Sequence, residues 1–358
     1  MRRALALLLG TALLWANPAR AVGDGNNLLP DIPAGPSTVR LRLLADVGAD
    51  AIMDIANAGD GTRRLFLVSP RGVIRIFQNG ALLGGFFLNE PASPTGSAMS
   101  SLAFHPLYAS NRKLYVITGE DVPNGSTPHY SPPQNDTGTA FDNIVVEYLV
   151  QSGNPNAVDT TTRRELLRMH KPEDAHNVND LVFAPSGMGH LLIATGDGGL
   201  TRTGTPTQYQ TNAQPTTLPY GKFLRIDVDS IGPNGRYAIP PDNPFASGAG
   251  GNVPEIYAWG VRNPWRITRD RLTGTIYSGV NGDFTIEQVY RVELGRNPGW
   301  ATNEGSFLWD PVTGNASVDP DPLNPPFTPP LAQYDHNGTT QAFGSVIGGY
   351  VYRGARMP

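Results

Sequence analysis

The chain has 358 residues, no cysteine and a formal net charge of −4, and 16% of its residues are charged. This mildly acidic balance argues against nucleic acid or an anionic membrane surface as a partner, and the absence of cysteine excludes thiolate zinc sites. Glycine (41) and proline (33) are unusually frequent. Such a composition favours many short elements joined by tight turns, as in an all-β protein.

The N-terminus has the pattern of an export signal. The opening MRR is a positive n-region, residues 4–16 form an apolar h-region, and ANPARA offers an A-x-A cleavage site that ends at Ala21. The apolar run is shorter than the roughly 20 residues that a transmembrane helix needs. We therefore predict a signal peptide over residues 1–21, periplasmic or secreted localisation, and no membrane span after the signal is removed.

Beyond residue 40, β-branched and aromatic residues recur in short runs separated by Gly, Pro, Asn and Asp. Four segments share a strand–turn–strand theme, and each is followed by a further strand; they begin at Ala51, Ser101, Leu181 and Trp265. Repeats of about 40–50 residues with three or four strands each are typical of a β-propeller. Polar, proline-rich insertions are predicted to be surface loops of a single domain over residues 22–358; they span 120–140, 200–220 and 303–335.

Of the six histidines, His176 has the most informative surroundings. It precedes the apolar run Leu181–Phe183, so its ring could project from a loop at the start of a strand, where catalytic residues are often found. A neutral imidazole there could take a proton from a substrate hydroxyl near pH 7. The pattern alone favours the alternative, a polar residue that fills a turn, which is the more common case.

A second candidate lies in YAWGVRNPWRIT, where Arg262 and Asn263 interrupt an aromatic-rich stretch. Pro264 disfavours helical geometry at Asn263, which predicts a turn or an extended segment. An arginine among aromatic residues needs an anionic or carbonyl partner, because its charge is costly to bury unpaired. Two explanations remain open here: a ligand site, or an arginine stacked on Trp259 or Trp265 and bonded to loop carbonyls.

At these residues the chain resembles a known family. The segments GKFLRIDVD, YAIPPDNPF, PEIYAWGVRNPWR, NPGW with the following EG, and GGYVYRG, supported by LAFHP and TGDGG, are similar to those of the soluble PQQ-dependent glucose and aldose sugar dehydrogenases. This glucose/sorbosone dehydrogenase family consists of six-bladed β-propellers. The resemblance implies an all-β propeller that binds PQQ and Ca²⁺.

The resemblance also implies roles for individual residues. His176 corresponds to the family's general base, which takes the proton of the sugar C1 hydroxyl while hydride passes to PQQ. Arg262 and Asn263 correspond to a cofactor-binding pair, and Arg262 would offset negative charge on the quinone oxygen. The implied reaction oxidises an aldose to a lactone and passes electrons to an external acceptor. His336 matches a family histidine near the site and is given no role.

The chain departs from the family pattern at the cofactor site and at the calcium loop. Gly96 stands where the family often has a cofactor-contacting glutamine, and Val178 and Asn179 replace glycines, so their Cβ atoms are expected to crowd a flat ring. GVNGD replaces the family's calcium loop. We predict Gly282, Asp283 and Glu287 as the calcium ligands, with solvated turn carboxylates as the alternative.

GGYVYRG normally opens the fifth blade, yet the sequence stops shortly after it, so the last one to two blades are expected to be missing from this chain. A fragment of a longer protein or a partner chain that closes the ring would account for this. The leading functional hypothesis is an exported PQQ- and Ca²⁺-dependent aldose dehydrogenase. The alternative is a non-catalytic extracellular propeller that binds a protein or glycan, because Hedgehog-interacting proteins resemble the same family. A calcium-dependent lactonase ranks last.

Overall fold

The computed structural model describes residues 28–29, 42–48, 50–90, 99–121, 127–131, 141–171, 175–199, 210–311, 313, 316–320, 327–336 and 345–355. The predicted signal peptide and Gly96 lie outside these residues. In the described part, strands dominate, and helical structure is limited to the single turn α1 (Tyr108–Asn111) and the short 3-10 helices η1 (Gln210–Ala213) and η2 (Ala249–Gly251). The all-β prediction is therefore confirmed.

In the described residues, the strands form five antiparallel sheets. The first holds β1 (Asp54–Ala56), β2 (Leu65–Ser69), β3 (Val73–Gln78) and β4 (Ala81–Leu82), with β5 (Leu88–Asn89) on β3. The second holds β6 (Ser101–Phe104), β7 (Lys113–Asp121), β8 (Phe141–Val150) and β9 (Val158–Lys171). The third holds β10 (Val178–Phe183), β11 (His190–Thr195), β12 (Lys222–Asp227) and β13 (Ile256–Trp259). The fourth holds β14 (Asn263–Arg269), β15 (Ile276–Asn281), β16 (Ile286–Arg291) and β20 (Ala332–Asp335).

A small fifth sheet lies in the insertion between β16 and β20. It holds β17 (Asn303–Glu304), β18 (Phe307–Trp309) and β19 (Ala316–Pro320). The prediction that residues 303–335 are only a surface loop is therefore wrong. The segment's many prolines obscured strands that are only two to five residues long.

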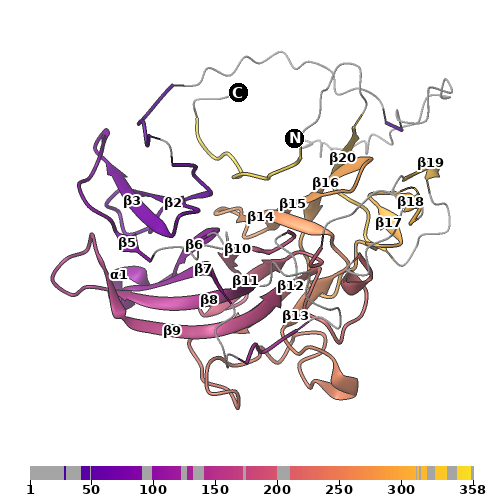
Figure 1. The fold of residues 1–358 in the computed structure, drawn as a ribbon, viewed down its shortest axis with the longest axis horizontal. Coiled ribbons are helices and arrows are strands. Elements are labelled where there is room, and N and C mark those ends of the chain that lie inside the picture. The colour runs from indigo at the N-terminus through magenta and orange to yellow at the C-terminus, as the bar shows by residue number, and fades with distance from the viewer. Residues whose placement is uncertain are drawn as a thin grey trace, which may run out of the picture.

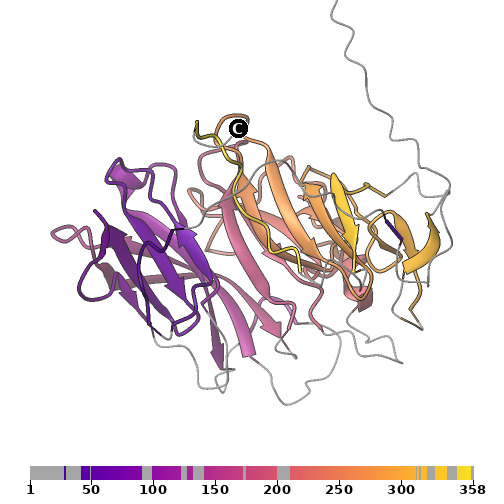
Figure 2. The same cartoon turned by 90° about the horizontal axis from the view of Figure 1, so that it is seen from above.

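The first four sheets are arranged as propeller blades. Their first strands contact one another in chain order, β1 with β6, β6 with β10 and β10 with β14. Figure 1 shows an arc of sheets with β6, β10 and β14 on its inner side and β9 and β13 toward its outside. From above, the sheets lie side by side in the order of the chain (Figure 2). The segment 345–355 runs across the open side of the arc, where the Tyr350 hydroxyl donates to the Ile55 carbonyl at 2.5 Å.

Apolar alternation along the strands places a hydrophobic core on each side of a sheet. In β11, Leu191 and Ile193 join a core shared with the second sheet, while Leu192 and Ala194 join a core shared with the fourth. Successive side chains of a strand point to opposite faces, so a strand between two cores is apolar along its whole length. Each buried Leu or Ile side chain contributes roughly 1.5–3 kcal/mol, and this packing fixes neighbouring sheets against each other.

Among the described residues, no helix has the length and apolar character required to cross a membrane.

Candidate active site

His176 lies in the turn that leads into β10, and its backbone is held in an unusual conformation. Its φ is +50°, a region that non-glycine residues seldom adopt, and its side chain is only 7% exposed. Lys171 donates its Nζ proton to the His176 carbonyl at 2.8 Å. A Cβ atom on Gly196 would lie 2.4 Å from that same carbonyl oxygen, so glycine is required in this turn. Positive φ values held in place by surrounding contacts are common at functional sites.

The ring of His176 is oriented by a buried carboxylate. Nδ1 lies 2.5 Å from Oδ1 of Asp197, whose side chain is 0% exposed. The other oxygen of Asp197 accepts the indole N–H of Trp300 at 2.8 Å. The carboxylate favours the tautomer with its proton on Nδ1, which leaves Nε2 as the nitrogen that can accept a proton. Burial and then the charge of Arg262 lower the pKa of His176, while Asp197 opposes this, and the imidazole is neutral near pH 7.

The Arg262 side chain contacts a carbonyl, a carboxylate and an aromatic ring. Nη1 donates to the Gly282 carbonyl, Nη2 pairs with Oδ1 of Asp283 at 3.0 Å, and the guanidinium lies 5.5 Å from the centre of the Trp300 ring. The backbone N–H of Asp197 donates to the Arg262 carbonyl at 2.8 Å. The predicted carbonyl partner and the stacking on a tryptophan are confirmed, while a ligand site at Arg262 stays a prediction. The tryptophan is Trp300 and not Trp259 or Trp265 as predicted, a partner that the local sequence did not indicate.

Asn263 begins β14 and faces β10. Its Oδ1 accepts a hydrogen bond from Nδ2 of Asn179 at 2.7 Å. Val178 packs in the core between the second and third sheets. The expectation that the Val178 side chain crowds the site is therefore wrong, because β10 turns it into that core. The structure brings His176, Arg262 and Asn263 together at the beginnings of two adjacent inner strands.

The predicted calcium ligands separate into two groups. Gly282 and Asp283 both contact Arg262. The two oxygens of Glu287 instead contact His336 Nε2 at 2.9 Å, Asn281 Nδ2 at 3.2 Å and the backbone N–H of Val346 at 2.8 Å. Glu287 thus joins β16 to the segment 345–355, and its hydrogen bond raises the pKa of His336.

Glu304 is a buried carboxylate beside this loop that the sequence analysis missed. Its Oε1 accepts backbone N–H groups, from Asp283 at 2.5 Å, Ile286 at 3.0 Å and Thr285 at 3.3 Å. Its Oε2 is buried and has no hydrogen-bond partner within the described ranges. Burial and the charge of Asp283 raise the pKa of Glu304 to about 7. Glu304 is the glutamate of the EG that follows NPGW, so the family motif contains it, but the motif did not indicate what this residue does.

The donor groups at this site fit a quinone and a hard cation. Arg262 supplies positive charge, Asn263 supplies an amide, and Trp300 supplies an aromatic surface. Carboxylate and carbonyl oxygens are the ligands that Ca²⁺ prefers, and the unpartnered Oε2 of Glu304 is a group that a cation would satisfy. No cluster of three or more His, Cys, Asp or Glu side chains is placed to hold a metal in the part of the chain that the structure describes. Backbone oxygens would therefore have to contribute.

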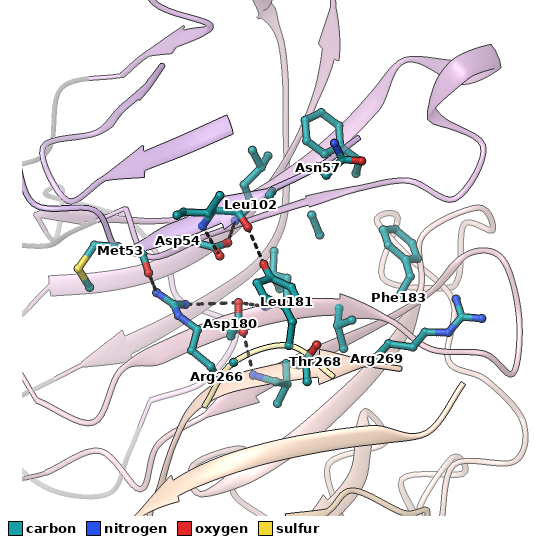
Figure 3. Close-up of a pocket in the computed structure, with 18 of the residues that line it drawn as sticks. Met53, Asp54, Asn57, Leu102, Asp180, Leu181, Phe183, Arg266, Thr268 and Arg269 are labelled. Atoms are coloured by element: carbon teal, nitrogen blue, oxygen red, sulfur yellow. Dashed lines mark hydrogen bonds and ion pairs between the residues drawn. The ribbon is translucent and has the colours of Figure 1, made fainter. Parts of the chain in front are cut away.

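A cavity of about 590 Å³ lies between the inner strands β1, β6, β10 and β14. Figure 3 shows Asp54, Asp180 and Arg266 pointing toward one another in it. Arg266 Nη1 lies 3.3 Å from Oδ1 of Asp180, which also accepts the Ser101 hydroxyl at 2.6 Å. Burial and then the charge of Asp54 raise the pKa of Asp180 to about 7, and burial raises that of Asp54 as well. The sequence showed only single charged residues inside apolar strands.

Together these features define a β-propeller with a His–Asp pair and an Arg–Asn pair at the beginnings of neighbouring inner strands. The chain belongs to the Glucose / Sorbosone dehydrogenase family, whose model matches residues 50–358. This match confirms the resemblance that the motifs indicated.

Two kinds of curated relatives are similar to the chain. The HIPL1 protein of Arabidopsis thaliana is 29% identical over 94% of this chain and 52% of that protein. The Hedgehog-interacting protein of Mus musculus is 32% identical over 60% of this chain and 29% of that protein. The chain thus spans about half or less of these relatives.

Solved structures show the same fold. The PQQ-bound aldose sugar dehydrogenase of Streptomyces coelicolor is 21% identical, with a TM-score of 0.55 over 85% of this chain and 73% of that one. The apo-form of the soluble aldose sugar dehydrogenase of Escherichia coli is 18% identical, with a TM-score of 0.53 over 76% and 69%. At these identities the likeness establishes the propeller fold.

Proposed function

We propose that this chain carries the active site of an exported quinoprotein that oxidises the C1 hydroxyl of an aldose to a lactone. The observation that supports this most directly is the buried His176–Asp197 pair, since Asp197 also binds the indole N–H of Trp300, the ring over which the Arg262 guanidinium lies. The family membership and the fold shared with a PQQ-bound sugar dehydrogenase support the same assignment.

In this proposal His176 is the general base. Its Nε2 takes the proton of the C1 hydroxyl, and Asp197 stabilises the imidazolium that forms. PQQ, when bound, would supply the two-electron acceptor for the hydride of C1, and an external acceptor would take up these electrons. Arg262 and Asn263 would hold the cofactor, and the buried guanidinium would offset negative charge on the quinone oxygen.

Calcium belongs to the same proposal. Gly282, Asp283 and Glu287 are the ligands that we predict in place of the family's calcium loop. Glu304 is a further carboxylate beside Asp283, whereas Glu287 contacts His336 and Val346. A dication at this loop would offset the negative charge of Asp283 and Glu304, which Arg262 alone cannot balance.

The test uses the full chain with PQQ, CaCl₂ and a panel of aldoses. Dye reduction measures turnover, and the visible spectrum measures bound quinone separately. We expect reduction by at least one aldose, with a His176→Gln variant that binds PQQ but turns over at least a hundredfold more slowly. Absence of both turnover and a quinone spectrum would refute the enzyme assignment.

A second candidate is a propeller that binds a partner without catalysis. It is favoured by the similarity to proteins named for interacting with Hedgehog, and by Asn179 in place of a glycine. Calorimetry separates the two candidates, because a binder without cofactor chemistry gives no heat when PQQ is added to the chain already saturated with Ca²⁺.

A further inference from the structure

Asn179 is a buried amide on β10 whose orientation is fixed by its partners. It is 3% exposed, and its Nδ2 donates both to Oδ1 of Asn263 at 2.7 Å and to the carbonyl of Pro264 at 3.1 Å. A backbone carbonyl only accepts hydrogen bonds, so the nitrogen of Asn179 must face it. The two ends of an asparagine amide are otherwise hard to tell apart, and here the Pro264 carbonyl distinguishes them.

This arrangement decides which end of Asn263 faces away from β10. Because Asn179 approaches with its nitrogen, Asn263 must present its oxygen to Asn179. The Nδ2 of Asn263 is then directed away from that contact and is available as a hydrogen-bond donor. Without Asn179 the amide of Asn263 could turn over and present an acceptor, since its oxygen and nitrogen have nearly the same shape.

The position of Asn179 is itself fixed from both strands. Arg266 Nη1 donates to the Asn179 carbonyl at 2.9 Å and lies 3.3 Å from Asp180 Oδ1. The other oxygen of Asp180 accepts the backbone N–H of Ile267 at 2.8 Å. Figure 3 shows Asp180 and Arg266 joining the two strands in the cavity. These bonds hold β10 and β14 in register beside the Asn179–Asn263 contact.

We propose that Asn179 is a positioning residue that holds Asn263 as a hydrogen-bond donor toward the cofactor, so that the site selects ligands with acceptor oxygens such as quinone carbonyls and carboxylates. This inference rests on the proposed PQQ chemistry. If the amide of Asn263 were inverted, its Oδ1 would face an acceptor oxygen of the ligand. One hydrogen bond to the ligand would be lost, and the two oxygens would repel each other. The expected loss is about ten- to a hundredfold in the affinity for PQQ.

The test compares Asn179→Asp, Asn179→Ala and wild type, each as the full chain with Ca²⁺, by calorimetric titration with PQQ. An aspartate only accepts, so it draws the nitrogen of Asn263 toward itself and turns the oxygen to the ligand. Asn179→Ala removes the constraint without choosing an orientation. We expect Kd to rise severalfold in Asn179→Ala and about ten- to a hundredfold in Asn179→Asp.

A double-mutant cycle separates positioning from a merely structural role. In an Asn263→Ala background there is no amide to orient, so Asn179→Ala should leave Kd for PQQ unchanged. Additive losses of affinity, or a folded Asn179→Asp chain with wild-type Kd, would overturn the positioning role alone. If Asn179→Asp does not fold, the alanine cycle decides. A wild-type chain that binds no PQQ would overturn the proposed function and the positioning role together.

Discussion

Nδ1 of His176 lies 2.5 Å from Oδ1 of Asp197, and the second oxygen of that carboxylate accepts the indole N–H of Trp300. One buried group therefore orients the candidate base and the aromatic residue beneath Arg262. A carboxylate in this position fixes the tautomer of the imidazole and stabilises its protonated form.

Replacing Asp197 with asparagine should therefore slow proton transfer more than it weakens cofactor binding. An amide can present its N–H to Nδ1, which favours the tautomer with the proton on Nε2 and removes the base. We expect kcat for aldose oxidation to fall about 10²- to 10⁴-fold while Kd for PQQ stays within a few-fold. Steady-state dye reduction and PQQ titration measure these quantities, with the exposed Asp46→Asn as the control. Equal turnover in both variants would contradict a role for the pair.

Asp180 should make stability depend on pH in a direction opposite to that of most carboxylates. Its pKa is raised to about 7, above its unfolded value, so the folded state binds more protons than the unfolded state between roughly pH 4 and pH 7. The contribution of Asp180 to the free energy of unfolding is therefore highest below pH 4, and it falls as the pH rises to 7.

The measurement is urea unfolding of wild type and Asp180→Asn at pH 5 and pH 8. The asparagine carries no titrating charge, so the free energy of unfolding should fall less between these pH values in the variant, by about 1–3 kcal/mol. Loss of hydrogen bonds to Ser101 and Ile267 lowers the stability of the variant at both pH values and cancels in this comparison. Parallel pH profiles for the two proteins would show that Asp180 titrates as an ordinary carboxylate.

Calcium should stabilise the chain through Glu304. Saturating Ca²⁺ at about a hundred times Kd adds roughly 2.7 kcal/mol to the free energy of unfolding. The effect should be larger at pH 8 than at pH 6, because the pKa of Glu304 is about 7 and the ion needs the ionised carboxylate.

Thermal unfolding with and without CaCl₂ measures this, and Glu304→Gln should remove most of the calcium-dependent rise in Tm. Glu287→Gln is the matched comparison, since Glu287 contacts His336 and Val346 instead of Asp283. An equal loss in both variants would place Glu287 among the ligands as well. A full calcium response in Glu304→Gln would exclude Glu304 from the site.

Gly196→Ala tests how tightly the turn of TGDGG packs against the base. The added Cβ would lie 2.4–2.7 Å from backbone and Cβ atoms of His176, so the turn before β10 must move. We expect the free energy of unfolding to fall by about 1–3 kcal/mol and turnover to fall with it. Gly153→Ala is the control, because a Cβ there meets nothing within 4 Å. Chemical unfolding and dye reduction that match the control would argue against this packing.

The strands of the blades could be predicted from the sequence, because each is a short run of apolar, β-branched and aromatic residues bounded by turn residues. The apolar run of β11 faces two cores, and both can be inferred from alternation along one short segment. His176 and Arg262 were also indicated, because each stands out against its local surroundings. The strands β17–β19 gave no comparable signal, since they are short and lie in a proline-rich insertion.

The partners of these residues did not follow from local pattern. Asp197 and Trp300 are 103 residues apart, and no local spacing predicts that they share a hydrogen bond. Glu287 and Glu304 are both acidic residues that follow the GVNGD segment in the sequence. Only the structure shows that Glu287 binds the backbone of Val346, whereas Glu304 binds the backbone of Asp283. Asn179 was noticed as a departure from glycine, but its contact with Asn263 depends on the register between two sheets.

The imidazole comes from the turn before β10 and the guanidinium from the residue before β14, so the proposed site straddles the boundary between two blades. Neither sheet alone supplies both groups. Quinone binding would therefore depend on the two blades staying packed against each other. On heating, we expect quinone binding to be lost at a lower temperature than the circular dichroism signal of the strands.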